Sequence, residues 1–506
     1  MRTEFVALLA ISLSGCATSA LRMSPPAADR PWTPRVDASG GLTVDRRGSE
    51  VAASKGYVLP GDPAASIVPK PPITDPAKIY ELADLIDLAE QSNPETRIAW
   101  NDARGAALAA GIARSAYLPR ITASALGGYK TDSGRAGALG MSANDSSSLT
   151  GAIGTVSLEW LLFDFGKRGA LVKAADQGAV IGDIGFTAAH QKLIYAVSLA
   201  FYGYSAARAR AASADASLAD AIEVETAASA RKAQGVSTIV EVAQARQLTA
   251  QANLAKVQAV GNAVDGYAVL LSAIGISPLT PIRIADIGKR PLPDDMEQPI
   301  DQALSAALAR RPDVLAALAA QKAADEVVRA ARADFKPKIF MSASGSYASG
   351  SIDLTALPGV DDQSPTVNLT NRRWGATILG GITIPIYDAG VRAATLERAR
   401  AKAASSTEVL NRARLTGSQE VVMAHSKLRT SIAAVAATKA LLEASQTTYD
   451  AALETFKRGL GTSTDVLVAE RQLLEARNLA ADAHSSTLSA AAALALACGR
   501  LGSAPS

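Results

Sequence analysis

The chain has little of the chemistry that most enzymes and metal sites use. Its 506 residues include only two cysteines, Cys16 and Cys498, and three histidines, His190, His425 and His484, which are scattered with no cysteine or carboxylate at ligand spacing. The sequence also lacks a glycine-rich phosphate loop, a G-x-S-x-G motif and an H-E-x-x-H motif. We therefore predict no catalytic residues, no cofactor and no metal site.

Aromatic residues, net charge and long apolar runs are also scarce. Aromatics make up 5% of the chain, and 51 basic against 48 acidic residues leave a net charge of +3, which indicates no nucleic-acid partner. Beyond the amino terminus there is no run of about 18 apolar residues, so no membrane-spanning helix is predicted. Any part that crosses a membrane must then use β-strands. Alanine dominates the apolar share, which favours long, closely packed helices over a globular core.

The amino terminus is typical of a bacterial lipoprotein signal. Residues 5–13 (FVALLAISL) are too few to span a bilayer but fit the apolar part of a signal peptide. Small residues then precede Cys16, the position where such signals accept a diacylglycerol. We predict a signal peptide over 1–15 and lipidation, with palmitate, at Cys16, which leaves Cys498 without a disulfide partner. An ordinary secretory signal with an incidental cysteine is the alternative. Ala17 rather than Asp indicates sorting to the outer membrane.

A proline-rich segment follows the signal. Residues 22–78 hold ten of the 23 prolines and show no apolar periodicity. We interpret 16–78 as a lipidated, extended tether.

The rest of the chain is a tandem duplication. ARSAYLPRITASALGGY at 113–129 matches ARADFKPKIFMSASGSY at 331–347 at an offset of 218, and FDFG at 163–166 matches YDAG at 387–390 at an offset of 224. The six additional residues indicate an insertion around 352–371. We predict a first repeat over 79–276, a linker over 277–298, a second repeat over 299–500 and a tail over 501–506.

Each repeat contains two segments with strand-like alternation. We predict strands at about 117–130, 152–163, 335–348 and 375–387. Aromatic residues near their ends and intervening Gly, Ser and Asn favour outer-membrane strands, although strands of a soluble sheet would show a similar pattern. Four strands cannot close a membrane barrel, since the smallest has about eight. The chain must lend strands to a shared barrel, with eight in a dimer or twelve in a trimer.

Long helices fill the remainder of each repeat. Proline is absent from 166–233 and from 390–458, and each stretch would form a helix roughly 100 Å long at about 1.5 Å per residue. Turns at Gly235 and Gly459 then lead into return helices over 240–275 and 464–498. Rods of this length must pack against others as coiled coils. Asp164 and Asp388 precede the long helices, where capping is a better interpretation than a catalytic pair.

These features together resemble the TolC family of outer-membrane channels over residues 79–500. The resemblance rests on the duplicated plan, on the ARSAYLPRI and ARADFKPKI segments, and on the glycine turns with an acidic residue six positions later. It implies a mostly α fold with a small transmembrane β part. In that fold a homotrimer builds one 12-stranded β-barrel and a trimeric α-barrel tunnel.

The resemblance also implies a function and partners. It implies a passive conduit in a tripartite efflux system, anchored in outer-membrane lipid and extending into the periplasm. There it would meet a periplasmic adaptor protein and an inner-membrane pump, RND-type or alternatively an ABC exporter. A channel of type I protein secretion is the alternative, and a lipoprotein spacer without a pore is a third possibility.

Finally, the resemblance assigns a periplasmic gate. The acidic ring of the family falls on Asp465, its latching tyrosine on Phe456, and its partner in the first repeat on Glu241. The second acidic position is Val468 and the latching arginine position is Gly461, so most of the latch is missing. Arg458 or Lys457 is then the candidate partner of Glu241.

Overall fold

The computed structural model describes residues 21, 23–25, 27–44, 49–50, 57–67, 74–138, 141–288, 292, 300–350 and 374–502. The chain divides into two compact units, Met1–Thr74 and Asp75–Ser506, each described here by itself. The predicted signal peptide, Cys16 and the predicted insertion at 352–371 lie outside the described residues.

The first unit contains some local structure, while the lipidated tether over 16–78 stays a prediction. Three two-residue strands, β1 (Arg35–Val36), β2 (Leu42–Thr43) and β3 (Ser49–Glu50), form a sheet in the order β2-β1-β3. Asp37 accepts the backbone N–H groups of Ser39 and Gly41, and Asp62 accepts that of Leu42. These carboxylates satisfy backbone N–H groups of the turns, a contact that apolar periodicity in the sequence does not predict.

The four-stranded sheet of the second unit begins with a long hairpin. β5 (Arg120–Ala138) pairs antiparallel with β6 (Met141–Phe163), β6 with β8 (Lys338–Gly350), and β8 with β9 (Trp374–Thr383). The first two strands are longer than predicted, because ladder pairing continues through the Gly-, Ser- and Asn-rich stretch that lacks alternation. β9 is shorter than predicted and ends at Thr383.

The duplication also preserves strand register. In the first repeat Arg120 pairs with Glu159, and in the second Lys338 pairs with Thr383. Adding 218 to the first partner and 224 to the second converts one pair into the other. The two offsets found in the sequence therefore describe three-dimensional equivalence as well as sequence similarity.

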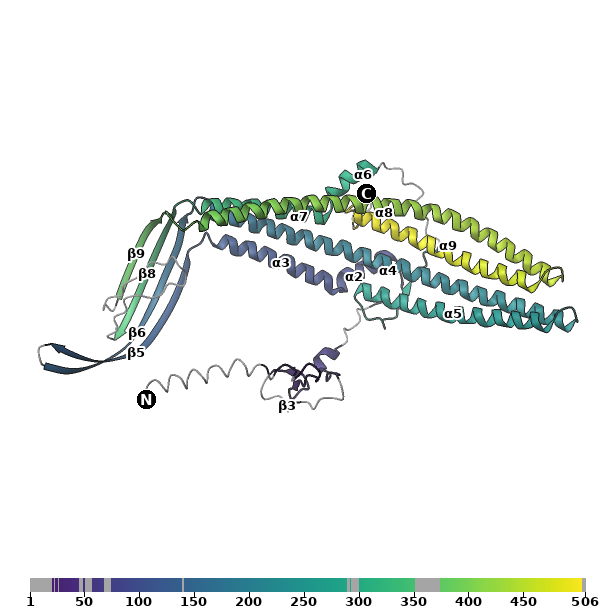
Figure 1. The fold of residues 1–506 in the computed structure, drawn as a ribbon, viewed down its shortest axis with the longest axis horizontal. Coiled ribbons are helices and arrows are strands. Elements are labelled where there is room, and N and C mark those ends of the chain that lie inside the picture. The colour runs from purple at the N-terminus through teal and green to yellow at the C-terminus, as the bar shows by residue number, and fades with distance from the viewer. Residues whose placement is uncertain are drawn as a thin grey trace. The chain divides into compact units, whose positions relative to one another are not determined.

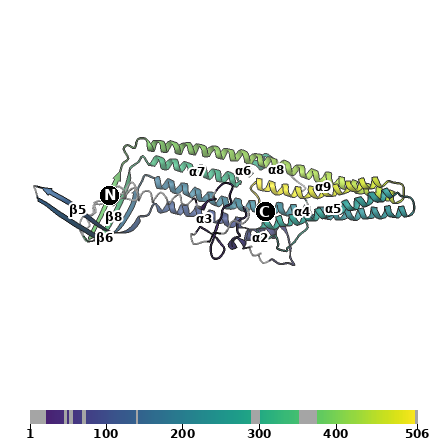
Figure 2. The same cartoon turned by 60° about the horizontal axis from the view of Figure 1, so that its bottom comes forward.

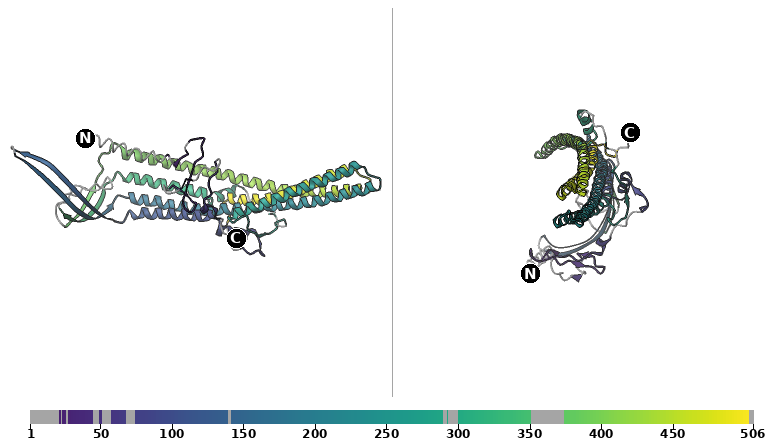
Figure 3. Two further views of the ribbon diagram at one scale, coloured as in Figure 1. Left: turned by 90° about the horizontal axis from the view of Figure 1, so that it is seen from below. Right: turned by 90° about the vertical axis from the view of Figure 1, so that its right-hand side faces the viewer.

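Helices continue each strand pair into a long layered wall (Figure 1). α4 (Lys167–Ala233) and α8 (Val391–Lys457) run its length. α4 packs against α3 (Pro94–Ser115) and α5 (Ile239–Ile274) on one side and against α7 (Pro312–Ala333) and α9 (Ser463–Ala497) on the other; α8 packs against α7 and α9. The hairpins α4–α5 and α8–α9 lie side by side at the far end (Figure 2). Seen end-on, these helices follow a curved arc with two free edges (Figure 3).

The shorter helices meet end to end through matching contacts in the two repeats. Asn93 precedes α3 and donates from Nδ2 to the carbonyl of Ala273 near the end of α5, at 3.0 Å. Arg311 precedes α7 and donates from Nη1 to the carbonyl of Ala497 at the end of α9, at 3.1 Å. Gly275 follows α5 at a φ of +86°, and a Cβ there would lie 2.7 Å from the Cα of Asn93. Only glycine allows both this backbone conformation and this close approach.

A buried core fills the middle of the second unit. It combines side chains of α2 (Leu82–Ser92), α4 and α5 with Ile276, Ile282, Ile284 and Ile287. Strand β7 (Arg283–Ile284) pairs in parallel with β4 (Ile79–Tyr80). The segment 277–298, interpreted as a linker, therefore supplies core residues, while α6 (Ile300–Leu308) packs on α8.

Helix α5 stands out among the long helices for its apolar composition. Among the described residues, α5 is long and apolar enough to cross a membrane by length and composition. The sequence-based prediction rested on uninterrupted apolar runs. In α5 the polar residues are few and widely spaced, so the mean hydropathy of the helix stays high. Only 17% of this apolar window is buried within the chain.

Candidate functional site

The far ends of the two helical hairpins, residues 231–241 and 455–465, form what we call the hairpin tip. Gly235 and Gly459 adopt φ values of +77° and +80°, and each ends its long helix in a left-handed turn. The next residues donate back to the helix: Val236 N–H to the carbonyl of Arg231 at 3.0 Å, and Leu460 N–H to that of Thr455 at 2.9 Å. The two predicted turn glycines thus reverse the chain by the same mechanism.

The predicted acidic gate residues occupy equivalent positions in the tip. Glu241 and Asp465 each lie three residues after the threonine that caps a return helix. Asp465 accepts from the hydroxyl of Thr462 at 2.7 Å and from its N–H at 3.2 Å. These two hydrogen bonds hold the pKa of the exposed Asp465 carboxyl below its usual value, and the bond from the Thr462 hydroxyl has the larger effect. Asp465 therefore presents a carboxylate to solvent at neutral pH.

Glu241 does not pair with either proposed basic partner. Its Oε2 accepts from the hydroxyl of Ser237 at 2.7 Å. Lys457 instead pairs with Glu223 of α4 at 2.7 Å, and Arg458 lies 3.7 Å from Glu454 of its own helix. Within one chain both basic side chains therefore have other carboxylate partners, and the pairing of Glu241 with Arg458 or Lys457 stays a prediction.

Phe456 holds the two hairpins together through its ring and its carbonyl. The side chain is fully buried in a cluster that includes Val224, Leu453 and Val466. The guanidinium of Arg231 lies over the ring, 4.5 Å from its centroid, and Nη1 donates to the Phe456 carbonyl at 2.8 Å. An aromatic ring without a hydroxyl can therefore still join α4 to α8. Sequence analysis missed Arg231, although basic residues in the last turn of both long helices were visible.

Buried polar contacts continue between α4 and α9 above the tip. Ser217 donates to Glu470, whose side chain is buried, and Arg477 pairs with Asp220 at 3.0 Å. Burial raises the pKa of the Glu470 carboxyl, which the Ser217 hydrogen bond offsets in part. Burial, with Asp220 nearby, also raises the pKa of Tyr449 on α8. These contacts tie α4 to the second hairpin above the apolar cluster.

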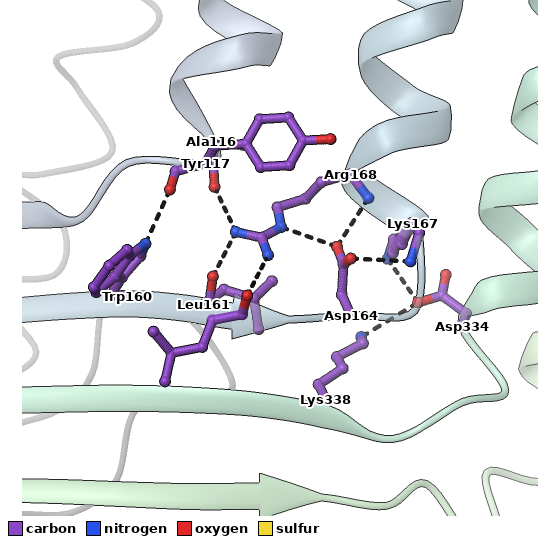
Figure 4. A network of polar contacts seen from close by, with 11 residues as sticks. Ala116, Tyr117, Trp160, Leu161, Asp164, Lys167, Arg168, Asp334 and Lys338 are labelled. Atoms are coloured by element: carbon purple, nitrogen blue, oxygen red, sulfur yellow. Dashed lines mark hydrogen bonds and ion pairs between the residues drawn. The ribbon is translucent and has the colours of Figure 1, made fainter.

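A second site lies where the strands become helices, at the segment we call the first junction, residues 160–168 (Figure 4). Arg168 is buried and donates to the carbonyls of Ala116, Leu161 and Leu162 at 3.1, 2.5 and 3.1 Å. Its Nε pairs with Asp164 at 3.1 Å. One guanidinium thus fastens the end of α3 and the end of β6 to the start of α4.

The capping prediction for the two aspartates is confirmed. Asp164 accepts the backbone N–H of Arg168 at 2.8 Å, and Asp388 accepts that of Arg392 at 2.9 Å. Beside the first junction, Lys167 and Lys338 both pair with Asp334, at 2.7 and 3.2 Å, which links the repeats (Figure 4). These carboxylates are therefore occupied by structural partners.

The histidines and the second cysteine show no arrangement for chemistry. In the part of the chain that the structure describes, no group of three or more His, Cys, Asp or Glu side chains could hold a metal ion. His190 lies 3.4 Å from Glu90. Cys498 is a half-buried free thiol, and burial raises its pKa.

Comparisons with known proteins agree with this architecture. The family model described as outer membrane efflux protein matches residues 85–276 and 303–500. The outer membrane efflux protein BepC of Brucella suis is 30% identical over 399 residues, 77% of this chain and 79% of BepC. Protein CyaE of Bordetella pertussis is 27% identical over 460 residues, 90% of this chain and 92% of CyaE. A crystal structure of a membrane protein from Pseudomonas aeruginosa superposes with a TM-score of 0.69 at 23% identity, covering 86% of this chain and 96% of that one.

The family model covers both repeats, and the duplicated strand-and-helix wall has the fold of solved outer-membrane channels. The chain therefore belongs to the outer membrane efflux protein family, the TolC-like channels, whose members are passive conduits rather than enzymes.

Proposed function

We propose that three copies of this chain assemble into one continuous channel, the outer-membrane component of a tripartite efflux system. The observation that carries the proposal is the pair of free edges on a single wall. Strand order β5-β6-β8-β9 leaves β5 and β9 at the two open edges of the sheet, and the helices leave α3 and α5 on one side and α8 on the other. The edges differ, so joining them head to tail gives a closed ring rather than a two-fold dimer.

Exposed apolar side chains at these helical edges support burial against another copy. On α5 they recur at helical spacing, and α8 carries its own set. The residues are Leu254, Val257, Val260 and Val264 on α5, and Leu415, Val422, Met423 and Leu441 on α8. Soluble surfaces rarely leave apolar stripes of this length uncovered.

Strand number supports three copies. Four strands per chain are too few for a barrel, since outer-membrane barrels need about eight or more and tolerate no open edge in lipid. Three copies supply twelve strands, and the same closure turns the helical walls into a tunnel that extends into the periplasm. The tunnel would meet a periplasmic adaptor and an RND-type inner-membrane pump at the hairpin tip.

Chemical crosslinking and bilayer conductance test the proposed channel. Purified protein should crosslink as trimers and give single-channel conductance in a planar bilayer. Deletion of the gene should raise sensitivity to small toxic compounds, whereas loss of a secreted protein instead would favour type I secretion with an ABC exporter. Trimers that never conduct would contradict the channel function.

The amino terminus provides the first specific prediction. We propose that Cys16 carries the lipid anchor, so Cys16→Ser should abolish metabolic labelling with palmitate, and Cys498→Ser should leave the labelling unchanged. Partial channel function should survive, because the strands supply their own hold on the membrane. Labelling that persists in Cys16→Ser would contradict the anchor.

Asp465 provides the second prediction. In a ring of three copies its exposed carboxylates would converge, and their negative potential would concentrate cations at a narrow mouth. Asp465→Asn should then lower cation selectivity and block by trivalent cations in bilayer recordings. Glu454→Gln, an exposed acid on the outgoing helix of the same hairpin, serves as the control. Unchanged block in Asp465→Asn would mean that Asp465 does not line the constriction.

A further inference from the structure

The two strand-to-helix junctions have the same turn and the same residue pattern, but the arginine of the second has fewer hydrogen-bond acceptors than that of the first. The second junction, residues 384–392, repeats the Asp-x-Gly-x-Arg pattern of the first, with Asp388 and Arg392 in place of Asp164 and Arg168. Phe165 and Ala389 share a φ of +54°, and a left-handed glycine follows each of them. The turn itself is therefore formed alike in both repeats.

The arginines of the two junctions have very different surroundings. Arg168 reaches three carbonyls as well as its aspartate. Arg392 pairs with Asp388, with Nε 2.8 Å from Oδ2, but its Nη1 is buried without a hydrogen-bond partner among the described residues. A buried N–H group without an acceptor is costly, so the second junction is incomplete in a single chain.

The missing acceptors can be identified from the duplication. Leu161 and Leu162, whose carbonyls Arg168 binds, correspond to Pro385 and Ile386 at the offset of 224. In the first repeat strand β6 continues to Phe163, next to the turn. In the second, β9 stops at Thr383 and leaves the carbonyls of Pro385 and Ile386 outside any ladder.

The reason lies in the strand neighbours. β6 is paired on both sides, by β5 and by β8, whereas β9 is paired only with β8. Beyond Thr383 the side chains of Ile384, Ile386 and Tyr387 are 60%, 91% and 87% exposed. Backbone N–H and C=O groups at an open sheet edge are unpaired, and in lipid they need another strand. The free strand on the opposite edge of the same chain is β5.

We infer that strand β5 of the next copy pairs with residues 384–387, extends β9 through Tyr387 and brings the carbonyls of Pro385 and Ile386 onto Arg392. This inference rests on the proposed ring of copies and adds its register. Within the chain, Trp160 of β6 pairs with Met341 of β8. Adding 224 to the first and subtracting 218 from the second gives Ile384 opposite Ala123 of the next copy.

The transfer of register is justified by pairs already present. The same offsets convert the β5–β6 pairs into the β8–β9 pairs without a shift. A slip of one residue would turn every side chain to the opposite face of the sheet. The β6–β8 pairs shift register between Leu161 and Phe163, so the transferred register is fixed at Ile384, which corresponds to Trp160 before that shift.

Cysteine crosslinking tests the register directly. In a Cys498→Ser background, Ala123→Cys with Ile384→Cys should form an inter-copy disulfide on mild oxidation, because paired residues place their Cβ atoms about 4.5–5.5 Å apart. The matched control, Ala125→Cys with Ile384→Cys, uses the same face two residues away, a shift of about 6.6 Å along the strand. Each single-cysteine variant measures background, including any reaction with Cys16.

The outcomes separate this inference from the proposed function. Strong crosslinking of 123 with 384 and background crosslinking of 125 with 384 would support the register. Trimers that form while 125 crosslinks instead, or while neither pair does, would overturn the register and leave the channel intact. Absence of trimers would overturn both.

Arg392 provides an independent measurement on the same assembly. Arg392→Gln should lower the temperature at which trimers dissociate in detergent, while the helical content of the chain stays unchanged. Arg398→Gln, a nearby basic residue of α8, is the control. Equal dissociation temperatures for Arg392→Gln and the parent would show that Arg392 gains no acceptors on assembly.

Discussion

Replacing Arg168 with glutamine is expected to destabilise the protein by about 3–5 kcal/mol, because the change breaks a buried ion pair and leaves the other charge uncompensated. The side chains of Arg168 and Asp164 are 9% and 6% exposed, so water can replace few of the lost contacts. Three carbonyls at the meeting point of α3, β6 and α4 also lose their donor. The measurement is thermal unfolding of the purified protein in detergent.

Lys167→Gln is the matched control for Arg168→Gln. Lys167 is the adjacent residue and pairs with Asp334, but its side chain is 30% exposed, so we expect a loss of about 0–1 kcal/mol. The double variant with Asp164→Asn should cost less than the sum of the single variants, because it removes both charges together. Similar melting temperatures for Arg168→Gln and Lys167→Gln would show that the junction is not held by its guanidinium.

The helical part was the most predictable from sequence. Each repeat contains a proline-free, alanine-rich stretch with a glycine at either end, which favours one long helix. The helices α4 and α8 occupy these stretches. Gly235 and Gly459 were recognisable as turns because only glycine takes the left-handed conformation without strain. The duplication then related each element of one repeat to its counterpart in the other.

The strand ends were less predictable, for two different physical reasons. Residues 131–138 extend β5 although they lack alternating apolar residues, because their main chain pairs with β6. Such main-chain pairing leaves no periodic pattern in the sequence. At the other edge, residues 384–387 alternate well but form no strand, because β9 has a neighbour on one side only within the chain. The alternation of apolar residues indicates which face of a strand is buried. The residue at which a strand ends depends instead on how far the neighbouring strand pairs with it.

The contacts of the tip could not be derived from a family pattern alone. The family pattern has a tyrosine at the position of Phe456 and an arginine at the position of Gly461, and this chain has neither. The structure joins the same helices through Arg231, a residue of the preceding hairpin, and through a buried ring. Such substitutions change the chemistry of a contact while keeping the two surfaces that meet.

The tip has two kinds of contact that could hold the hairpins together, and their magnitudes differ. The ion pair of Lys457 with Glu223 is largely exposed, and such pairs contribute about 0–1 kcal/mol. Phe456 is fully buried, and truncation of a buried phenylalanine to alanine costs about 3–5 kcal/mol. The ring should therefore dominate the closed arrangement of the tip.

Phe456→Ala is accordingly expected to loosen the tip and raise the conductance of the resting channel in planar bilayers, whereas Lys457→Gln should change it little. Arg231 would also lose the ring beneath its guanidinium, a contact that contributes about 0.5–2 kcal/mol. Leu460→Ala, in the same turn but 82% exposed, controls for a general effect of truncation near the glycine. A Phe456→Ala channel that melts at a lower temperature yet conducts like the parent would show that the ring stabilises the fold without closing the pore. Closure would then have to be assigned to the polar contacts between α4 and α9, beginning with Ser217 and Glu470.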